Sequence, residues 1–335
     1  MEWPMCRYEI IDRKKNKLRK KIMEICIVVS ADNNYSRHLG VMLYSLLSAA
    51  DSQVEFVIYV LNGGISKSNI ARISNLVSGF GSVVHFIDMD EKLYSSYPLS
   101  NHIRQSAYYR ISIQYLLSTL CSKAIYLDCD MIVKDDISKL WEIDVSGHIL
   151  AAVEDSGFEH NNRLFMPDNT LYFNSGVMLI NLDNWRKADI SGRAHKFIQE
   201  YPDRLLLHDQ DALNAVICGE WRPLHPRWNQ QTKMFRTRYS DTSFSEDELA
   251  EALQFPAIIH FTESSKPWHY LNEHPFRDEY YKFLQCTEWK FKFPKLQAGI
   301  NSIMKPIVGI TYKLLDNLKS VYREASNVVI VCINF

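Results

Sequence analysis

The sequence lacks several patterns that would assign it to a common class of protein. Its seven cysteines form no CxxC pair, which argues against a zinc ribbon or a disulfide scaffold. There is no apolar run of about 18 residues, so no membrane-spanning helix is predicted. The formal net charge is only −1, which excludes binding of nucleic acid through overall basicity. The motifs GxGxxG and GxxxxGK[ST] are absent, which argues against a Rossmann dehydrogenase or a P-loop enzyme.

The charge is distributed unevenly along the 335 residues. Residues 1–22 carry eight Lys or Arg against three acidic residues, and residues 287–323 carry seven against two. The chain shows no apolar N-terminal segment of the secretory type, and its cysteines suit a reducing compartment, so we expect a cytoplasmic protein. We predict a basic extension over 1–22, one globular body over 23–285 and a basic segment over 286–335.

Apolar runs rich in β-branched residues alternate with helical patterns. The predicted strands cover 24–30, 55–61, 82–87, 123–127, 150–153, 177–181 and 257–261. The predicted helices cover 35–50, 67–76, 104–120 and 209–217. This alternation predicts an α/β fold with a mostly parallel central sheet, in which ligands bind at the carboxyl ends of the strands.

The segment Asp128-Cys129-Asp130 is the first candidate site, because apolar residues (KAIYL and MIV) flank it on both sides. Two carboxylates in apolar surroundings are costly to ionise without compensation. A divalent cation would compensate them, and oxygen ligands suit Mg²⁺ or Mn²⁺. The alternative is a strand end that is capped by carboxylates.

His260 lies in the apolar segment AIIHF. A single histidine in such a strand is usually a hydrogen-bonded core residue. Joined to the two aspartates, it would complete an Asp/Asp/His site that suits Mn²⁺. Lys266 follows six residues later and would supply a cation for phosphate oxygens.

Further polar residues have both a binding and a structural interpretation. The loop at 31–35 can bind a base and a ribose, or it can cap the following helix. Asn174 stands next to small residues that suit either the close approach of a ligand or a bulged strand. Asp209 and Gln210 begin a helix, where they can bind sugar hydroxyls or act as caps. Arg110 can neutralise the aspartate cluster or a diphosphate, or it can form an ordinary ion pair.

In their order along the chain, these segments resemble glycosyltransferase family 8, especially the bacterial α-galactosyl- and α-glucosyltransferases of lipopolysaccharide and capsule assembly. The matching segments are SADNNY (30–35), SAYYR (106–110), LDCDMIVKDDISKLW (127–141), YFNSGVMLINLDNWR (172–186), HDQDALN (208–214) and HFTESSKPWH (260–269).

The resemblance implies a GT-A fold, UDP-galactose or UDP-glucose as the donor, and Mn²⁺ or Mg²⁺ held by Asp128, Asp130 and His260. The implied donor site consists of Ala31, Asp32, Asn34, Tyr35, Arg110, Asp128, Cys129, Asp130, Asn174, Asp209, Gln210, Glu263 and Lys266. Asp155 and Thr262 would contact the acceptor.

Family members retain the anomeric configuration of the transferred sugar. The resemblance places Gln210, a poor nucleophile, nearest the reacting face, which favours front-face attack, with Asp209 as the alternative nucleophile. The chain departs from the family pattern at Glu263, where close relatives often have glycine. A carboxylate near a diphosphate is unfavourable unless it points away.

The C-terminal segment carries apolar residues every three or four positions over 296–321, with aromatic residues and lysines alternating before them. This pattern is typical of an amphipathic anchor on an anionic membrane, and the alternative is a helix packed on the body. We expect peripheral binding to the inner face of the cytoplasmic membrane through 286–323. The expected acceptor is a glycan, lipid-linked or free, in lipopolysaccharide, lipooligosaccharide or capsule assembly. The alternatives are transfer to a glycan on a surface protein, a non-catalytic nucleotide-sugar binder and a metal-dependent phosphohydrolase.

Overall fold

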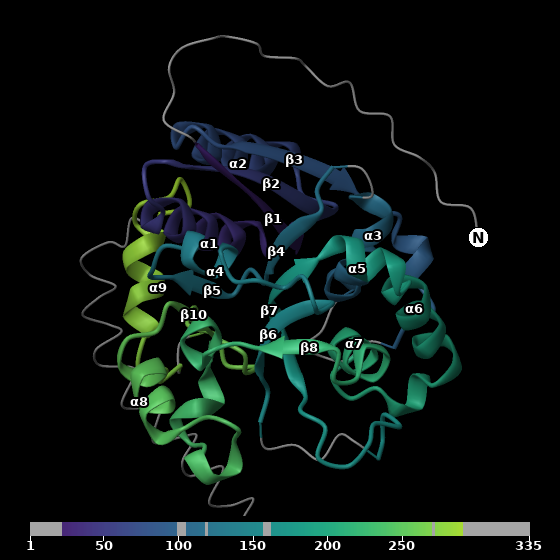
Figure 1. The fold of residues 1–335 in the computed structure, drawn as a ribbon. Helices are drawn as coiled ribbons and strands as arrows, with labels where there is room; N and C mark the ends of the chain where they lie inside the picture. The colour runs from purple at the N-terminus through teal and green to yellow at the C-terminus, as the bar shows by residue number, and fades with distance from the viewer. Residues whose placement is uncertain (1–21, 99–104, 118–119, 157–161, 270–271, 291–335) are drawn as a thin grey trace, which may run out of the picture.

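The structure is a computed structural model that describes residues 22–98, 105–117, 120–156, 162–269 and 272–290. Strands alternate with helices in its first part (Figure 1). These elements are β1 Met23–Asp32, α1 Ser36–Ala49, β2 Val54–Gly63, α2 Lys67–Gly79, β3 Val83–Asp88 and β4 Lys123–Leu127. The four strands and the first two helices predicted for this part are therefore confirmed, with small shifts at their ends.

The long helix predicted over 104–120 is wrong. Its described part consists of a 3₁₀ helix, η2 Gln105–Ser112, and one α-helical turn, α3 Ile113–Leu116. Every side chain from Tyr108 to Gln114 is buried. Tertiary contacts all around the segment, rather than one amphipathic face, therefore determine its conformation.

The second part of the chain has shorter elements. They are β5 Met131–Val133, α4 Ser138–Trp141, β6 Leu150–Glu154, β7 Phe173–Asn181, α5 Leu182–Lys187, α6 Ile190–Glu200, α7 Asp209–Ile217, β8 Trp221–Pro223, η4 Pro226–Asn229, β9 Gln230–Gln231, η5 Thr232–Phe235, α8 Glu246–Gln254, β10 Ile258–His260 and α9 Arg277–Leu284. The predicted strand at 177–181 begins four residues earlier, so the Asn174 segment lies inside β7 and not in a loop.

Within the described residues, seven strands form one sheet in the order β3-β2-β1-β4-β7-β6-β8. β1 pairs in parallel with β2 and β4, and β2 with β3, whereas β7 runs antiparallel to β4 and β6. The predicted α/β fold with a mostly parallel sheet is confirmed. A second sheet of the described part, which the sequence did not predict, has the order β5-β10-β9.

Both faces of the large sheet are covered, as Figure 1 shows, with α1 and α2 on one side and α5, α6 and α7 on the other. Ile25 and Ile27 of β1 point into the core under α1 and α2, and Cys26 and Val28 point into the core on the opposite face. All of them are buried, which explains why β1 is apolar throughout instead of alternating.

Residues 286–290 continue the body beyond α9. The Trp289 ring lies on α1 at Gly40, its indole N–H donates to Asn69 Oδ1 at 3.3 Å, and Arg72 of α2 lies 5.6 Å from its centre.

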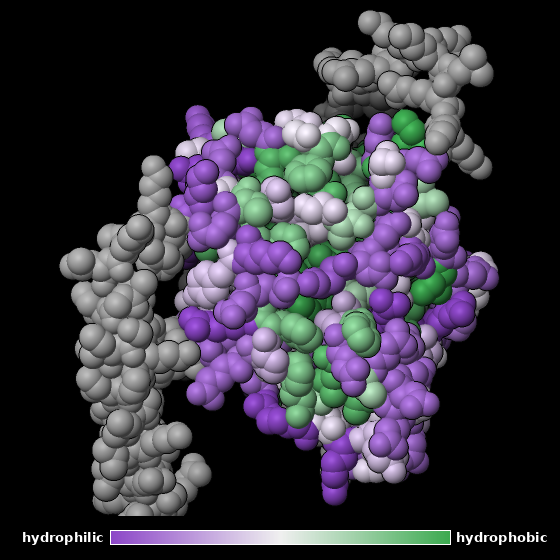
Figure 2. Space-filling model, turned by 90° about the vertical axis from the view of Figure 1, so that its left-hand side faces the viewer, coloured by the Kyte–Doolittle hydropathy of each residue, from purple (hydrophilic) through white to green (hydrophobic). Residues whose placement is uncertain are grey.

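The predicted N-terminal extension and the amphipathic stripe over 296–321 fall outside the described residues. No helix in the described part of the chain is both long and apolar enough to span a bilayer. Figure 2 shows apolar side chains gathered between hydrophilic ones on the side that carries α1, α8 and α9.

We predict that Gly40→Ala destabilises the protein by about 1–3 kcal/mol. An added Cβ would lie 2.4 Å from the Trp289 ring, so the indole would have to move. Overpacking then outweighs the gain in helix propensity of about 1 kcal/mol that alanine brings. Urea unfolding measures the difference. Gly79→Ala at the end of α2 is the control, because its Cβ would meet no atom within 4 Å. A Gly40→Ala protein as stable as the wild type would contradict this packing.

Candidate functional site

A cavity of about 530 Å³ lies at the carboxyl ends of β1 and β4. Tyr35, which follows β1, lines one side of it. The opposite wall comes from β7 and from the start of α7. The cavity is therefore where ligands of parallel sheets are expected.

The segment Asp128-Cys129-Asp130 lies between the two sheets and lines this cavity. The N–H of Asp128 donates to the carbonyl of Gly176 in β7 at 2.9 Å, and the carbonyl of Asp130 accepts from the N–H of Phe261 at 3.0 Å. Cys129 is buried, and its thiol donates to the carbonyl of Ser30 at 3.1 Å. Each end of the segment is therefore held by the backbone of a different sheet.

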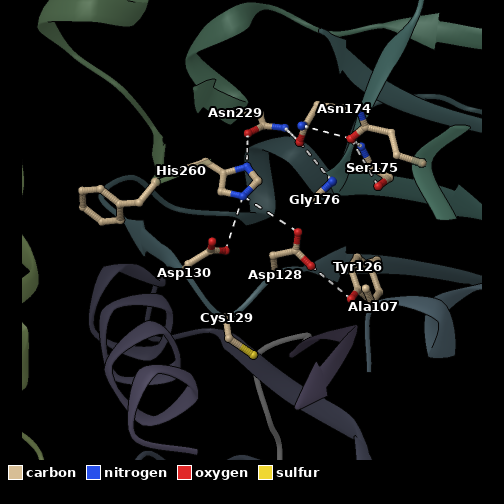
Figure 3. A network of polar contacts seen from close by, with 12 residues as sticks. Ala107, Tyr126, Asp128, Cys129, Asp130, Asn174, Ser175, Gly176, Asn229 and His260 are labelled. Atoms are coloured by element: carbon tan, nitrogen blue, oxygen red, sulfur yellow. Dashed lines mark hydrogen bonds and ion pairs between the residues drawn. The ribbon is translucent and has the colours of Figure 1, made fainter. Parts of the chain in front are cut away.

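The antiparallel pairing of β10 with β5 brings His260 to the aspartates, because His260 lies opposite Met131, the residue after Asp130. Its Nε2 lies 3.4 Å from Asp130 Oδ1 and 3.8 Å from Asp128 Oδ2 (Figure 3). One ligand atom from each of the three residues lies within 4.8 Å of the other two. The predicted Asp/Asp/His cluster is thus assembled from residues 130 positions apart.

The hydrogen bonds behind His260 suit a metal ligand. Asn229 Nδ2 donates to Asn174 Oδ1 at 2.9 Å, so the Oδ1 of Asn229 is left to face His260 Nδ1 at 2.8 Å. An amide oxygen only accepts, so Nδ1 carries the proton and Nε2 presents its lone pair to the aspartates. A metal-ligating histidine needs such a hydrogen-bond acceptor on its other ring nitrogen, because the acceptor fixes the tautomer and the orientation of the ring. The two carboxylates and this imidazole nitrogen therefore fit a divalent cation such as Mn²⁺.

Lys266 also lies at the cluster, with its Nζ 2.6 Å from Asp130 Oδ2. Burial opposes the ionisation of Asp130, but the ammonium of Lys266 and the neighbouring His260 ring together outweigh burial and hold the pKa of Asp130 well below its usual range. Asp130 is therefore ionised at neutral pH, as a metal ligand must be.

Arg110 connects two carboxylates on the opposite wall. Its Nη2 lies 2.8 Å from Asp128 Oδ1 and its Nε lies 3.0 Å from Asp209 Oδ2. The guanidinium also donates to the carbonyl and the hydroxyl of Ser175. Burial raises the pKa of Asp209 to about 6, although Arg110 lowers it. Arg110 therefore belongs to the cavity wall, and its ion pairs are not ordinary surface pairs.

Gln210 is held at both ends of its amide. Its Oε1 accepts from the N–H of Ser175 at 3.0 Å and from Asn174 Nδ2 at 3.2 Å. Its Nε2 donates to Asp155 Oδ2 at 2.7 Å. Gln210, Asn174 and Asp155 all line the cavity, so these three predicted residues lie together.

The loop after β10 forms another edge of the cavity, with Thr262, Glu263 and Lys266. Of the 31–35 loop, only Tyr35 lines it. Asp32 Oδ1 instead accepts from the N–H of Tyr35 at 2.9 Å and so closes a local turn before α1, whereas no side chain in the described part of the chain caps the helix itself. Binding of a base by Ala31, Asp32 and Asn34 remains a prediction.

The sequence did not point to Asn229 or Lys233. Asn229 lies in η4, and no local motif separates it from other loop asparagines. Lys233 lies in η5 and pairs with the Asp155 carboxylate, although the two are 78 positions apart. Only the fold reveals these contacts.

Comparisons with known proteins agree with this geometry. The model of glycosyl transferase family 8 matches residues 26–272. General stress protein A of Bacillus subtilis is 43% identical over 268 residues, which cover 78% of this chain and 94% of that protein. Lipopolysaccharide 1,2-glucosyltransferase of Escherichia coli is 26% identical, with 77% of each chain covered. The crystal structure of the galactosyltransferase LgtC with donor and acceptor sugar analogs aligns with a TM-score of 0.71 and 27% identity, covering 82% of this chain and 99% of that one. A structure of an active-site variant of LgtC, in which glutamate replaces a glutamine, aligns equally well.

We predict that Gly176→Ala weakens Mn²⁺ binding about tenfold or more, the usual effect of disturbing the surroundings of metal ligands. An added Cβ would lie 2.3 Å from His260 Cε1 and 2.8 Å from Asp128 Oδ2, so one of these side chains must move. Titration calorimetry with MnCl₂ measures the affinity. Gly147→Ala is the control, because its Cβ would point into open space. Equal Mn²⁺ affinities of the wild type and Gly176→Ala would contradict the assignment.

Proposed function

The chain belongs to glycosyltransferase family 8, and from this membership we propose that it transfers a hexose from a UDP-sugar to a glycan with retention of configuration. The observation that carries the proposal is the Asp128/Asp130/His260 cluster, in which Asn229 fixes the histidine tautomer. LgtC, crystallised with donor and acceptor sugar analogs, has the same fold, which supports a donor and an acceptor in one cavity.

Asp128, Asp130 and His260 would hold Mn²⁺, or Mg²⁺ in its place. A bound cation would supply positive charge to the diphosphate as the glycosidic bond breaks. Lys266, which pairs with Asp130 in this structure, would contribute a second positive charge beside the cation and would contact the diphosphate oxygens. In this proposal Tyr35 stacks on uracil, with Ala31, Asp32 and Asn34 beside the base and the ribose.

Around the donor sugar would lie Arg110, Asp128, Asn174, Asp209 and Gln210, with Cys129 also in the donor site, since all of them line the cavity. The reaction needs either a nucleophile or a front-face attack by the acceptor hydroxyl. Asp209 Oδ2 is bound by Arg110 and by the hydroxyl of Ser175, which lowers its nucleophilicity. Gln210 is a poor nucleophile but has a fixed amide. These contacts support front-face attack, with Gln210 beside the reacting carbon and Asp209 as the alternative nucleophile.

Asp155 and Thr262, which also line the cavity, would contact the acceptor. The relative from Escherichia coli, named as a lipopolysaccharide glucosyltransferase, supports a glycan acceptor in lipopolysaccharide, lipooligosaccharide or capsule assembly. UDP-galactose and UDP-glucose are the two proposed donors. The basic composition of 286–323 supports a peripheral place on the inner face of the cytoplasmic membrane. The division into 1–22, 23–285 and 286–335 is part of this proposal, with the body extended to residue 290 because Trp289 packs on α1.

With Mn²⁺ present, we expect UDP release from one of three donors offered in parallel: UDP-galactose, UDP-glucose and UDP-N-acetylglucosamine. A coupled assay for UDP measures it. Asp130→Ala should abolish release, because it removes a metal ligand and the partner of Lys266. Release that persists in Asp130→Ala would contradict a metal-assisted transfer. UDP binding without release from any donor, even with acceptor glycans added, would favour the non-catalytic binder.

Gln210→Ala should lower kcat about 100-fold with little change in donor KM, because the amide acts beside the reacting carbon. Steady-state kinetics with the accepted donor measures both constants. Turnover close to that of the wild type would remove Gln210 from the reaction. A larger loss in Asp209→Asn, together with a glycosylated Asp209 peptide in mass spectra of Gln210→Ala, would instead establish Asp209 as the nucleophile.

A further inference from the structure

Glu263 places a carboxylate on the edge of the cavity that Lys266 also lines. The two residues share the short loop after β10 and are three positions apart. The proposed donor would bring a diphosphate to Lys266. An unpaired carboxylate at Glu263 would repel that diphosphate and would compete with it for the ammonium of Lys266.

The structure shows that Glu263 is paired. The Nη2 of Arg236 forms an ion pair with Glu263 Oε1. Arg236 directly follows η5 and does not itself line the cavity. The pair therefore joins the donor-side loop to a second loop that is 27 positions away in the sequence.

The same turn neutralises a second carboxylate of the cavity. Lys233 of η5 pairs with Asp155 on the proposed acceptor side, and Arg236 stands three positions later. Residues three apart in a 3₁₀ turn lie on one side of it. Its backbone closes through a hydrogen bond from the N–H of Arg236 to the carbonyl of Lys233 at 2.8 Å. One short turn thus directs two cations at two carboxylates of the same cavity.

We propose that Arg236 is a positioning residue for the donor: it holds the Glu263 carboxylate away from the diphosphate and leaves Lys266 to bind it. The inference rests on the donor assignment in the proposed function. It explains how this chain can carry a glutamate on this loop and still bind the donor, since Arg236, directly after η5, supplies the opposing charge. Removal of the Arg236 charge alone should therefore leave the Glu263 carboxylate to repel the diphosphate. Removal of both charges should abolish this repulsion.

The experiment measures UDP binding by titration calorimetry in the presence of MnCl₂, for the wild type, Arg236→Gln and the double variant Arg236→Gln/Glu263→Gln. We expect Arg236→Gln to weaken UDP binding about three- to fivefold at low ionic strength, the size of effect that a partly exposed ion pair allows. The difference should shrink at about 0.5 M salt, because the charges are screened. The double variant should recover most of the lost affinity. In steady-state kinetics, the donor KM of Arg236→Gln should rise while kcat changes less.

Arg238→Gln is the matched control. Arg238 lies two positions further on, is exposed and pairs with Asp241. We expect it to bind UDP as the wild type does. Thermal unfolding by circular dichroism checks that each variant is folded. A merely structural loss would not be repaired by Glu263→Gln. Wild-type UDP affinity in Arg236→Gln, or a double variant as weak as Arg236→Gln, would overturn this inference alone. A wild-type protein that does not bind UDP would overturn the donor assignment and this inference with it.

Discussion

The cavity depends on three residues that cross from one sheet to the other. Asp128 leaves the seven-stranded sheet through a backbone hydrogen bond to β7, and Asp130 enters the three-stranded sheet through a backbone hydrogen bond to Phe261. Because both residues belong to this crossing, two backbones fix the separation of their Cα atoms. His260, Arg110 and Lys266 then contact the carboxylates themselves. A displacement of either sheet would therefore change the spacing of the cluster.

The cavity also gathers more buried negative charge than a stable protein would hold without compensation. Each carboxylate has a cation from a distant part of the chain: Arg110 for Asp128 and Asp209, Lys266 for Asp130, and Lys233 for Asp155. These pairs offset the cost of burying the carboxylates, and they place cations where a polyanionic ligand could reach them. The side chains that stabilise the cavity are thus the same ones that would bind the proposed donor.

The sequence predicted the fold well where local pattern is decisive. The apolar strands β1, β2, β3 and β4 were recognisable, as were the two carboxylates after β4, because both faces of the sheet are covered and polar residues are confined to its carboxyl ends. The helix predicted over 104–120 is wrong, since propensity says little about residues 108–114, whose side chains are all buried. Asn229, Lys233 and Arg236 could not be found, because each acts on a partner far away in the sequence. The loop at 31–35 stayed ambiguous, since the residues that cap a helix are also those that bind a nucleoside.

The hydrogen bonds behind the cluster have a direction. Each residue donates a hydrogen bond to the next: His260 to Asn229, Asn229 to Asn174, Asn174 to Gln210 and Gln210 to Asp155. Amides could carry such a chain in either sense, but groups of fixed kind select this one: the backbone N–H groups of Gly176 and Ser175 donate to Asn174 Oδ1 and to Gln210 Oε1, and the carboxylate of Asp155 accepts at the end of the chain. The backbone of β7, together with a carboxylate on the far side of the cavity, thereby dictates which nitrogen of His260 faces the aspartates.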